Sequence, residues 1–281
     1  MSGRTATVDA IEKIARTGRT GCIAEAAARL RTAERDCTPC APVRELIGTA
    51  DIETAYAVQS RIVAEFVDAG RILSGRKIGL TSAAVQAQLG VDQPDFGVLF
   101  ADMDCSGGRP VDVTRLLQPK VEAEVAFVLA SDIDMPVDEI TVRSYVEAGA
   151  PALEIVDSRI AGWDITLGDT IADNASSGLY VLGDRIPPGE MPELATVQMS
   201  MTENGTVVST GTGADCLGSP WAALAWLANV SRSLGAPLQA GEVVLSGALG
   251  PMATVTPGST YSASIGGLGC VSVTFTPGAP V

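Results

Sequence analysis

The sequence predicts an α+β fold, in which helices and strands occupy different parts of the chain. Helical patterns fill the first 71 residues, whereas short β-prone runs between turns fill the C-terminal third. Between these parts, strands and helices do not alternate in the regular way of a parallel βαβ protein. We therefore expect an N-terminal helical portion at residues 1–71 and a strand-rich portion at residues 72–281.

The composition narrows the class of protein. Hydrophobic residues make up 46% of the 281 positions, enough for a substantial core. No apolar run approaches the roughly 20 residues of a membrane helix, and residues 1–9 lack the apolar core of a signal peptide, so we expect a cytoplasmic protein. The formal net charge of −14 argues against nucleic acid or an anionic membrane as a partner, because both would repel the chain.

Helices are expected in two stretches of the N-terminal portion. Residues 6–36 are rich in alanine and carry charges at helical intervals, which predicts one or two helices. Asp51 is placed to cap a further helix that reaches Ala69, and Gly70 ends it. The apolar stripe of this helix consists of Ala55, Val58, Ile62, Val63 and Phe66.

The segment from residue 72 to residue 100 contains the first candidate acid–base residues. Residues 74–82 predict a strand, residues 83–89 a short helix, residues 90–97 a turn-rich loop, and residues 98–100 a second strand. The helical excursion can return Asp95, in the loop, to the edge at which Lys77 lies. Taken singly, each of the two is more often a surface charge than a catalytic group.

The sequence pattern predicts the structure of two further segments in the middle of the chain. Residues 135–149 predict a helix, with Pro136 near its first turn. Residues 163–178 form a long polar stretch with small residues, which is typical of a loop that lines a ligand site. A plain connecting loop explains the same stretch equally well.

Strands dominate the last third of the chain. Residues 197–202 alternate in the way of a half-buried strand, and Asn204-Gly205 is a strong signal for a hairpin turn. Residues 206–209 are then expected to form the returning strand of the hairpin. Residues 220–228 predict a helix whose aromatic side chains belong to the core. A buried strand at 241–245 leads into a glycine-rich turn without the spacing of a nucleotide-binding loop, and final strands are expected at 261–265 and 271–275.

Three acidic residues in apolar surroundings point to a metal site. Residues 119–129 predict a buried strand, in which Glu122 and Glu124 project from the same face. Two buried like charges repel each other, and the simplest arrangement that stabilises both is a shared divalent cation. Glu154 lies in a similar apolar run, and three carboxylates suit a hard ion such as Mg²⁺ or Mn²⁺. An exposed strand face with ordinary surface acids is the alternative.

The absence of histidine limits the chemistry that the chain can perform. It excludes Ser-His-Asp and Cys-His catalysis and histidine-ligated zinc. Acid–base chemistry must therefore come from carboxylates, Lys, Tyr, Cys or metal-bound water. Cys37 and Cys40 have the spacing of a redox or zinc pair, but no second pair completes a zinc site, and we expect incidental reduced thiols near a helix end.

Six short motifs along the sequence resemble those of a known group of enzymes, in the same order. They resemble the 2-keto-4-pentenoate hydratase and 4-oxalocrotonate decarboxylase group of the fumarylacetoacetate hydrolase superfamily, and the likeness runs from about residue 40 onward. The motifs are GRKIGLT at 75–81, DQPDFG at 92–97, QPKVEAE at 118–124, ALEIVDSR at 152–159, ADNA at 172–175 and LSGALG at 245–250.

The resemblance implies a fold, a metal and roles for particular residues. The fold would be a catalytic mixed β-roll at 72–281 with peripheral helices, and the chain would form a homo-oligomer, a pentamer or decamer. Mg²⁺ or Mn²⁺ would be held by Glu122, Glu124 and Glu154. Lys77 and Asp95 would be the acid–base pair, and an ion near Lys77 is expected to depress its pKa. Candidate substrate contacts are Ser246, the backbone of Gly247, Ser176 and Asn174.

The resemblance also implies a small 2-oxo or 2-hydroxy dienoic acid as substrate, in meta-cleavage breakdown of aromatic rings. We expect a hydratase that converts 2-hydroxypenta-2,4-dienoate to 4-hydroxy-2-oxopentanoate, because residues 92–103 resemble that branch more closely. A 4-oxalocrotonate decarboxylase on the same scaffold is the alternative. A C–C bond hydrolase ranks lower, since no histidine can activate water, and the intact glutamates argue against a non-catalytic partner of a neighbouring pathway enzyme.

Overall fold

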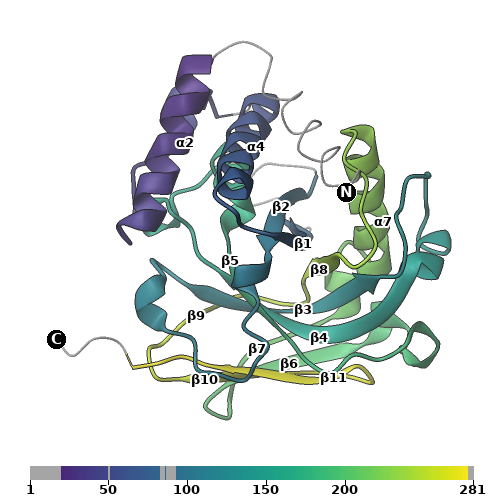
Figure 1. Ribbon diagram of the computed structural model, residues 1–281. Coiled ribbons are helices and arrows are strands. Elements are labelled where there is room, and N and C mark those ends of the chain that lie inside the picture. The colour runs from purple at the N-terminus through teal and green to yellow at the C-terminus, as the bar shows by residue number, and fades with distance from the viewer. Residues whose placement is uncertain (1–19, 50, 83–85, 87–92, 278–281) are drawn as a thin grey trace.

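The computed structural model of the chain describes residues 20–49, 51–82, 86 and 93–277 (Figure 1). Its helical portion comprises α2 (Thr20–Arg35), α3 (Arg44–Ile47) and α4 (Ile52–Asp68). The side chain of Asp51 accepts a hydrogen bond from the Thr54 N–H, which confirms the predicted cap of α4. The expected helices at residues 6–19 and 83–89 and the start of the loop at 90–92 lie outside the described residues, except for Gln86.

A curled sheet of seven strands forms the centre of the described chain. Its main path runs β2 (Asp95–Phe100), β1 (Leu73–Gly79), β8 (Val243–Ala248), β3 (Lys120–Leu129), β4 (Val146–Val156) and β5 (Ser177–Leu182). The seventh strand, β9 (Ala253–Thr254), pairs with the beginning of β3. The β1–β8 pair is parallel and the other pairs are antiparallel, so the predicted α+β class is confirmed.

A second sheet packs against the first. It has the order β11 (Gly269–Thr274), β10 (Thr260–Ile265), β6 (Gln198–Glu203) and β7 (Thr206–Thr212). Asn204 and Gly205 join β6 to β7 with φ angles of 48° and 85°, which confirms the predicted hairpin turn. Figure 1 shows α2, α4 and α7 (Pro220–Ser233) on one side of the large sheet and the small sheet on the other.

The helical portion is completed by residues from the strand-rich portion. Buried side chains of α2, α3 and α4 form one hydrophobic cluster with Ile160 and with residues of α6 (Leu167–Ala172). The buried Gln59 of α4 also donates hydrogen bonds to the carbonyls of Phe96 and Ile171, each at 2.9 Å. The sequence boundary between residues 71 and 72 therefore does not separate two hydrophobic cores.

Short 3₁₀ helices connect many of these elements. They span Ala101–Met103, Val113–Arg115, Thr141–Tyr145, Ala161–Trp163, Asn174–Ser176, Pro188–Glu190, Leu194–Thr196 and Gly213–Asp215. None of the helices in the described ranges combines the length and apolar character that crossing a membrane requires.

The predicted helix at residues 135–149 is wrong. Only Thr141–Tyr145 is helical, as a 3₁₀ turn, and Val146 already begins β4. The side chain of Asn229 in α7 accepts a hydrogen bond from the Val137 N–H and donates one to the Val137 carbonyl. These bonds satisfy the backbone of Val137 outside a helix, and pairing with β3 extends the residues from Val146 onward.

The stretch at 163–178 is not the continuous loop that we predicted, while its role in lining a ligand site stays a prediction. It contains α6 and the 3₁₀ helix Asn174–Ser176. The buried carboxylate of Asp169 accepts hydrogen bonds from the N–H groups of Val43, Arg44 and Thr166. Polar residues therefore occur here because they tie α6 to the N-terminal helices.

The loop predicted at 90–97 is wrong at its end. Asp95, Phe96 and Gly97 belong to β2, because they pair with β1 in register, with Asp95 opposite Gly79. The pairing with β1 gives these residues backbone partners that the local sequence does not reveal. Asp95 is therefore held by a strand.

Replacing Gln59 tests the link between the two portions. Gln59→Leu leaves the buried carbonyls of Phe96 and Ile171 without these donors, so the free energy of unfolding should fall by about 2–4 kcal/mol. Denaturant titration measures the loss. The exposed Gln198→Ala is the control and should stay within about 0.5 kcal/mol of the parent. Equal stability of Gln59→Leu and the parent would contradict the link.

Candidate metal centre and active site

Three glutamate side chains meet on one face of the large sheet. Glu122 lies opposite Glu154 in the β3–β4 ladder, and Glu124 follows Glu122 by two residues on the same face. One carboxylate oxygen from each of the three lies within 4.8 Å of the others. Glu124 and Glu154 are fully buried and Glu122 is partly buried. The predicted convergence is confirmed, and the role of the three as ligands stays a prediction.

The donor atoms of this cluster fit a hard divalent cation. Glu124 Oε2 accepts a hydrogen bond from the Gly247 N–H at 2.8 Å. Among the described residues, Glu124 Oε1 and Glu154 Oε2 are buried without any hydrogen-bond partner. Buried oxygens of this kind are costly unless a cation binds them. An all-oxygen set suits Mg²⁺, Mn²⁺ or Ca²⁺ better than zinc.

The electrostatics of the cluster lead to the same conclusion. Burial, followed by the negative charge of Glu154, raises the pKa of Glu122 to about 7. Burial, Glu154 and Glu122 together raise the pKa of Glu124 well above its usual value. Ionisation of all three carboxyl groups together is therefore unfavourable, and a cation that binds all three would offset that free-energy cost.

Lys77 lies beside the carboxylates. Its Nζ is 3.1 Å from Glu154 Oε1 and donates a hydrogen bond to the Ala175 carbonyl at 2.8 Å. Burial disfavours the ammonium, but the charges of Glu154 and Asp95 outweigh burial and raise the pKa of Lys77 above its ordinary value. The predicted depression of this pKa concerns the site with an ion bound and stays a prediction, because the raised pKa belongs to the protein without an ion.

Asp95 faces the same space as Lys77. On the paired strands, Asp95 lies opposite Gly79 and Lys77 lies opposite Gly97, so both side chains project from one face. A Cβ atom at Gly79 would collide with the Asp95 carboxylate, so glycine leaves room for it. Burial raises the pKa of Asp95 to about 6, although the Lys77 ammonium opposes the change. The structure thus brings the predicted pair together.

The sequence reasoning missed Ala175, whose carbonyl holds Lys77. Asn174, Ala175 and Ser176 have φ angles of 55°, 51° and 52°, a left-handed turn without glycine. Each such residue costs about 1–2 kcal/mol. The Asn174 amide stabilises the turn by accepting from the Val98 N–H and donating to the Val98 carbonyl. Asparagine favours this conformation, and it was the available signal.

The predicted substrate contacts bond mainly to the protein itself. Ser246 Oγ accepts from the Val125 N–H and lies 3.2 Å from the Gly247 carbonyl. Ser176 Oγ shares a hydrogen bond with Thr170 Oγ1, and the Gly247 N–H serves Glu124. These contacts, like those of Asn174, favour positioning roles, and binding of substrate by the four residues stays a prediction.

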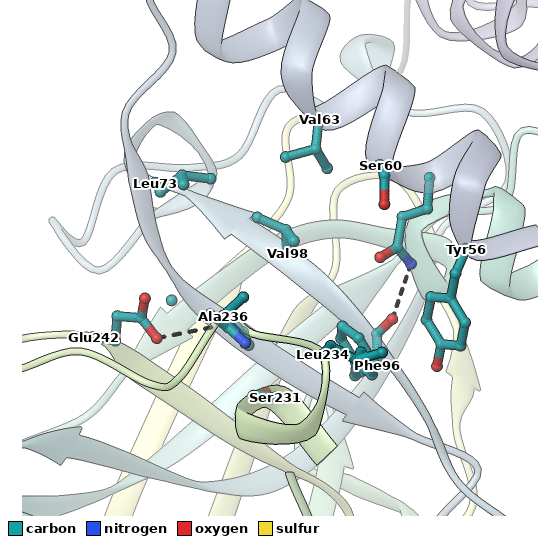
Figure 2. A pocket seen from close by; sticks show the side chains of 13 residues that line it. Tyr56, Ser60, Val63, Leu73, Phe96, Val98, Ser231, Leu234, Ala236 and Glu242 are labelled. Atoms are coloured by element: carbon teal, nitrogen blue, oxygen red, sulfur yellow. Dashed lines mark hydrogen bonds and ion pairs between the residues drawn. The ribbon is translucent and has the colours of Figure 1, made fainter. Parts of the chain in front are cut away.

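A separate cavity lies behind β1, on the face opposite Lys77. Figure 2 shows it between α4, β1, β2 and the end of α7, with Tyr56, Phe96 and Leu234 among the labelled lining residues. Arg76 forms an ion pair with Glu242 there, at 3.7 Å. The cavity volume is about 40 Å³, room for about two or three water molecules, so a dienoic acid does not fit it.

Comparison with known proteins identifies the family to which this chain belongs. Residues 78–276 match the family model described as fumarylacetoacetate (FAA) hydrolase C-terminal. The chain belongs to the fumarylacetoacetate hydrolase family. That range begins one residue after Lys77 and includes Asp95 and all three glutamates of the cluster.

Individual members of this family are similar over nearly the whole chain. The TodF product hydratase of Pseudomonas putida is 51% identical over 264 residues, which cover 92% of this chain and 97% of the relative. The 2-keto-4-pentenoate hydratase 2 of Dechloromonas aromatica is 52% identical over 254 residues, or 89% and 96% of the two chains. The structure of 4-oxalocrotonate decarboxylase from Pseudomonas putida G7, complexed with magnesium and adipate, superposes with a TM-score of 0.87 at 31% identity and covers 92% of this chain and 99% of that one.

Glu124→Gln tests the metal centre without an activity assay. The variant loses one of three anionic ligands, so its affinity for Mg²⁺ should fall by roughly 100-fold or more, because even outer partners of a site cost 10–100-fold. Calorimetric titration measures the affinity. Mg²⁺ should also raise the melting temperature of the parent more than that of the variant.

Glu147→Gln is the matched control for this experiment. Glu147 is an exposed glutamate on the same strand as Glu154, and its replacement should leave Mg²⁺ affinity unchanged. Parental affinity in Glu124→Gln, with the control also unchanged, would show that the cluster does not bind the metal.

Proposed function

We propose that the protein is a divalent-metal-dependent hydratase that converts 2-hydroxypenta-2,4-dienoate to 4-hydroxy-2-oxopentanoate. The observation that carries the proposal is the buried cluster of Glu122, Glu124 and Glu154 beside Lys77 and Asp95. Support comes from the hydratases of Pseudomonas putida and Dechloromonas aromatica, which are 51% and 52% identical over most of both chains. A hydro-lyase acting on a small 2-oxo or 2-hydroxy dienoic acid in meta-cleavage catabolism follows.

The three glutamates would hold the ion, Mg²⁺ or Mn²⁺. In the described part of the chain, Glu124 and Glu154 each offer a buried oxygen without a hydrogen-bond partner. When bound, such an ion supplies positive charge for the carboxylate and the 2-oxygen of the substrate. The Gly247 N–H orients Glu124, and Lys77 orients Glu154. The sheet thereby fixes the face on which the substrate is held.

The reaction requires a proton at C5 of the dienol, then water at C4 and a proton at C3. Lys77 carries a proton at Nζ, and Ala175 and Glu154 hold that atom in place. Asp95 is a buried carboxylate that can accept a proton from water or return one. In a chain without histidine, these two buried side chains beside the cluster are the proposed acid–base groups.

Decarboxylation of 4-oxalocrotonate is the second candidate function. The decarboxylase from Pseudomonas putida G7 has the same fold with a TM-score of 0.87. Its identity of 31% is lower than that of the hydratases, which is why hydration ranks first. The proposed homo-oligomer, pentamer or decamer, the cytoplasmic location and any contact with neighbouring pathway enzymes remain predictions.

The two functions are separated by supplying each substrate to the Mg²⁺-loaded protein. A hydratase should remove the ultraviolet absorbance of 2-hydroxypenta-2,4-dienoate and release no CO₂. Release of CO₂ from 4-oxalocrotonate, without turnover of the dienol, would show instead that the protein is the decarboxylase.

Lys77→Ala should lower turnover of the dienol by about 100-fold or more, the usual scale for an acid–base group. Mg²⁺ should bind at least as tightly as in the parent, since a cation has been removed from beside Glu154. Steady-state kinetics and calorimetry measure the two effects. The exposed Arg185→Ala is the control for loss of a positive charge, and parental turnover in Lys77→Ala would exclude the catalytic role.

A further inference from the structure

The distribution of lysine in this chain is uneven. Of the 19 basic residues, 16 are arginines and three are lysines, at positions 13, 77 and 120. Lys13 lies outside the described residues. Lys77 contacts the carboxylate cluster, and Lys120 is the first residue of β3, the strand that carries Glu122 and Glu124.

Lys120 shares a sheet face with the metal-site glutamates. The β3–β4 register is unbroken from Lys120 to Glu124, with Lys120 opposite Val156 and Glu122 opposite Glu154. Alternate residues of a strand project to one side, about 6–7 Å apart, so Lys120, Glu122 and Glu124 form a row. Lys120 and Glu122 are partly exposed, whereas Glu124 is fully buried. The end of this row that faces solvent is therefore the end at Lys120.

The Lys120 side chain rests on a fixed aromatic platform. Its Nζ lies 4.3 Å from the centroid of the Trp163 ring. The Trp163 indole N–H donates to the Gln118 carbonyl at 3.0 Å, and the Gly162 N–H donates to Gln118 Oε1 at 2.7 Å. Gln118 thus anchors the ring two residues before the lysine. An ammonium has three N–H donors and needs no hydrogen-bond acceptor to lie over a ring, so donors that point away from the ring can bind another partner.

In the described ranges of the chain no acidic side chain forms an ion pair with Lys120, and Glu122, the next residue of the row, is the acid whose charge acts on it. Lys77, in contrast, has both Glu154 and the Ala175 carbonyl. The rest of the molecule repels anions, since the formal net charge is −14. An anionic substrate that approaches three glutamates therefore needs positive charge at the open end of the row.

We propose that Lys120 captures the carboxylate of the incoming substrate and delivers it to the metal centre. The inference rests on the proposed function, and it assigns Lys120 to substrate association, with no part in proton transfer. The ligand class is a small 2-oxo or 2-hydroxy carboxylate. Trp163 and Gln118 are positioning residues that hold the ammonium at the entrance.

Lys120→Met tests the proposal, because methionine preserves an apolar stem over Trp163 and removes the charge. In the Mg²⁺-loaded full chain, kcat/KM for the dienol should fall by about 10-fold, mainly through KM, while kcat stays near the parental value. The parental kcat/KM should fall as NaCl rises, and that of the variant should depend less on salt. Lys120→Arg keeps a cation that can stack on the ring and should restore most of kcat/KM.

Arg185→Met is the matched control. It changes the net charge by the same single unit at an exposed position after β5, so it should retain the parental kcat/KM and salt dependence. A parental kcat/KM and salt dependence in Lys120→Met would overturn the proposal. A loss of kcat as large as that in Lys77→Ala would overturn it too, because Lys120 would then take part in the chemistry.

Binding of oxalate distinguishes failure of this proposal from failure of the proposed function. Oxalate is a planar dianion that mimics the chelating end of a 2-oxo acid, and its binding to the Mg²⁺-loaded protein needs no turnover. Calorimetry should show roughly 10-fold weaker binding to Lys120→Met than to the parent and to Arg185→Met. Equal affinities would overturn capture by Lys120, whereas a parent that binds oxalate but converts neither the dienol nor 4-oxalocrotonate would refute only the proposed function.

Discussion

Burial of three carboxylates side by side is the constraint on which the rest of this site depends. One carboxylate oxygen from each of Glu122, Glu124 and Glu154 lies within 4.8 Å of the others. Burial raises the pKa of all three, and repulsion by neighbouring glutamates raises the pKa of Glu122 and Glu124 further. The Gly247 N–H and the Lys77 ammonium offset part of the unfavourable charge. The predicted cation would offset the remainder, so the sheet that holds the glutamates together positions the predicted metal site.

The two faces of the β1–β2 pair carry different groups of side chains. Lys77 and Asp95 project toward the glutamates, while Arg76, Phe96 and Val98 line the small cavity beneath α4. Gln59 of α4 bonds to Phe96 and to α6, and α6 leads into the left-handed turn whose Ala175 carbonyl holds Lys77. The N-terminal helices are therefore connected, through Gln59 and α6, to the turn that holds Lys77 of the predicted acid–base pair.

Arginine and lysine have different places in this structure. Arg44 pairs with the buried Asp169, Arg159 with Asp173, and Arg76 with Glu242. The planar guanidinium suits such fixed, multiple contacts, whereas the ammonium of lysine is a compact charge on a flexible stem. Both described lysines lie on the face of the glutamate row.

The sequence by itself determined what depends on neighbours a few residues apart. The spacing of Glu122 and Glu124 within an apolar strand, the Asp51 cap and the Asn204-Gly205 turn are all local patterns, and all three are present. Only the tertiary structure decided the non-helical backbone at Val137, which is bonded to Asn229 across 92 residues, and the helix α6, whose Asp169 binds Val43 across 126 residues. Local periodicity carries no information about such distant partners. For the same reason, the raised pKa of Lys77 followed only once the strands had brought Glu154 and Asp95 to its side.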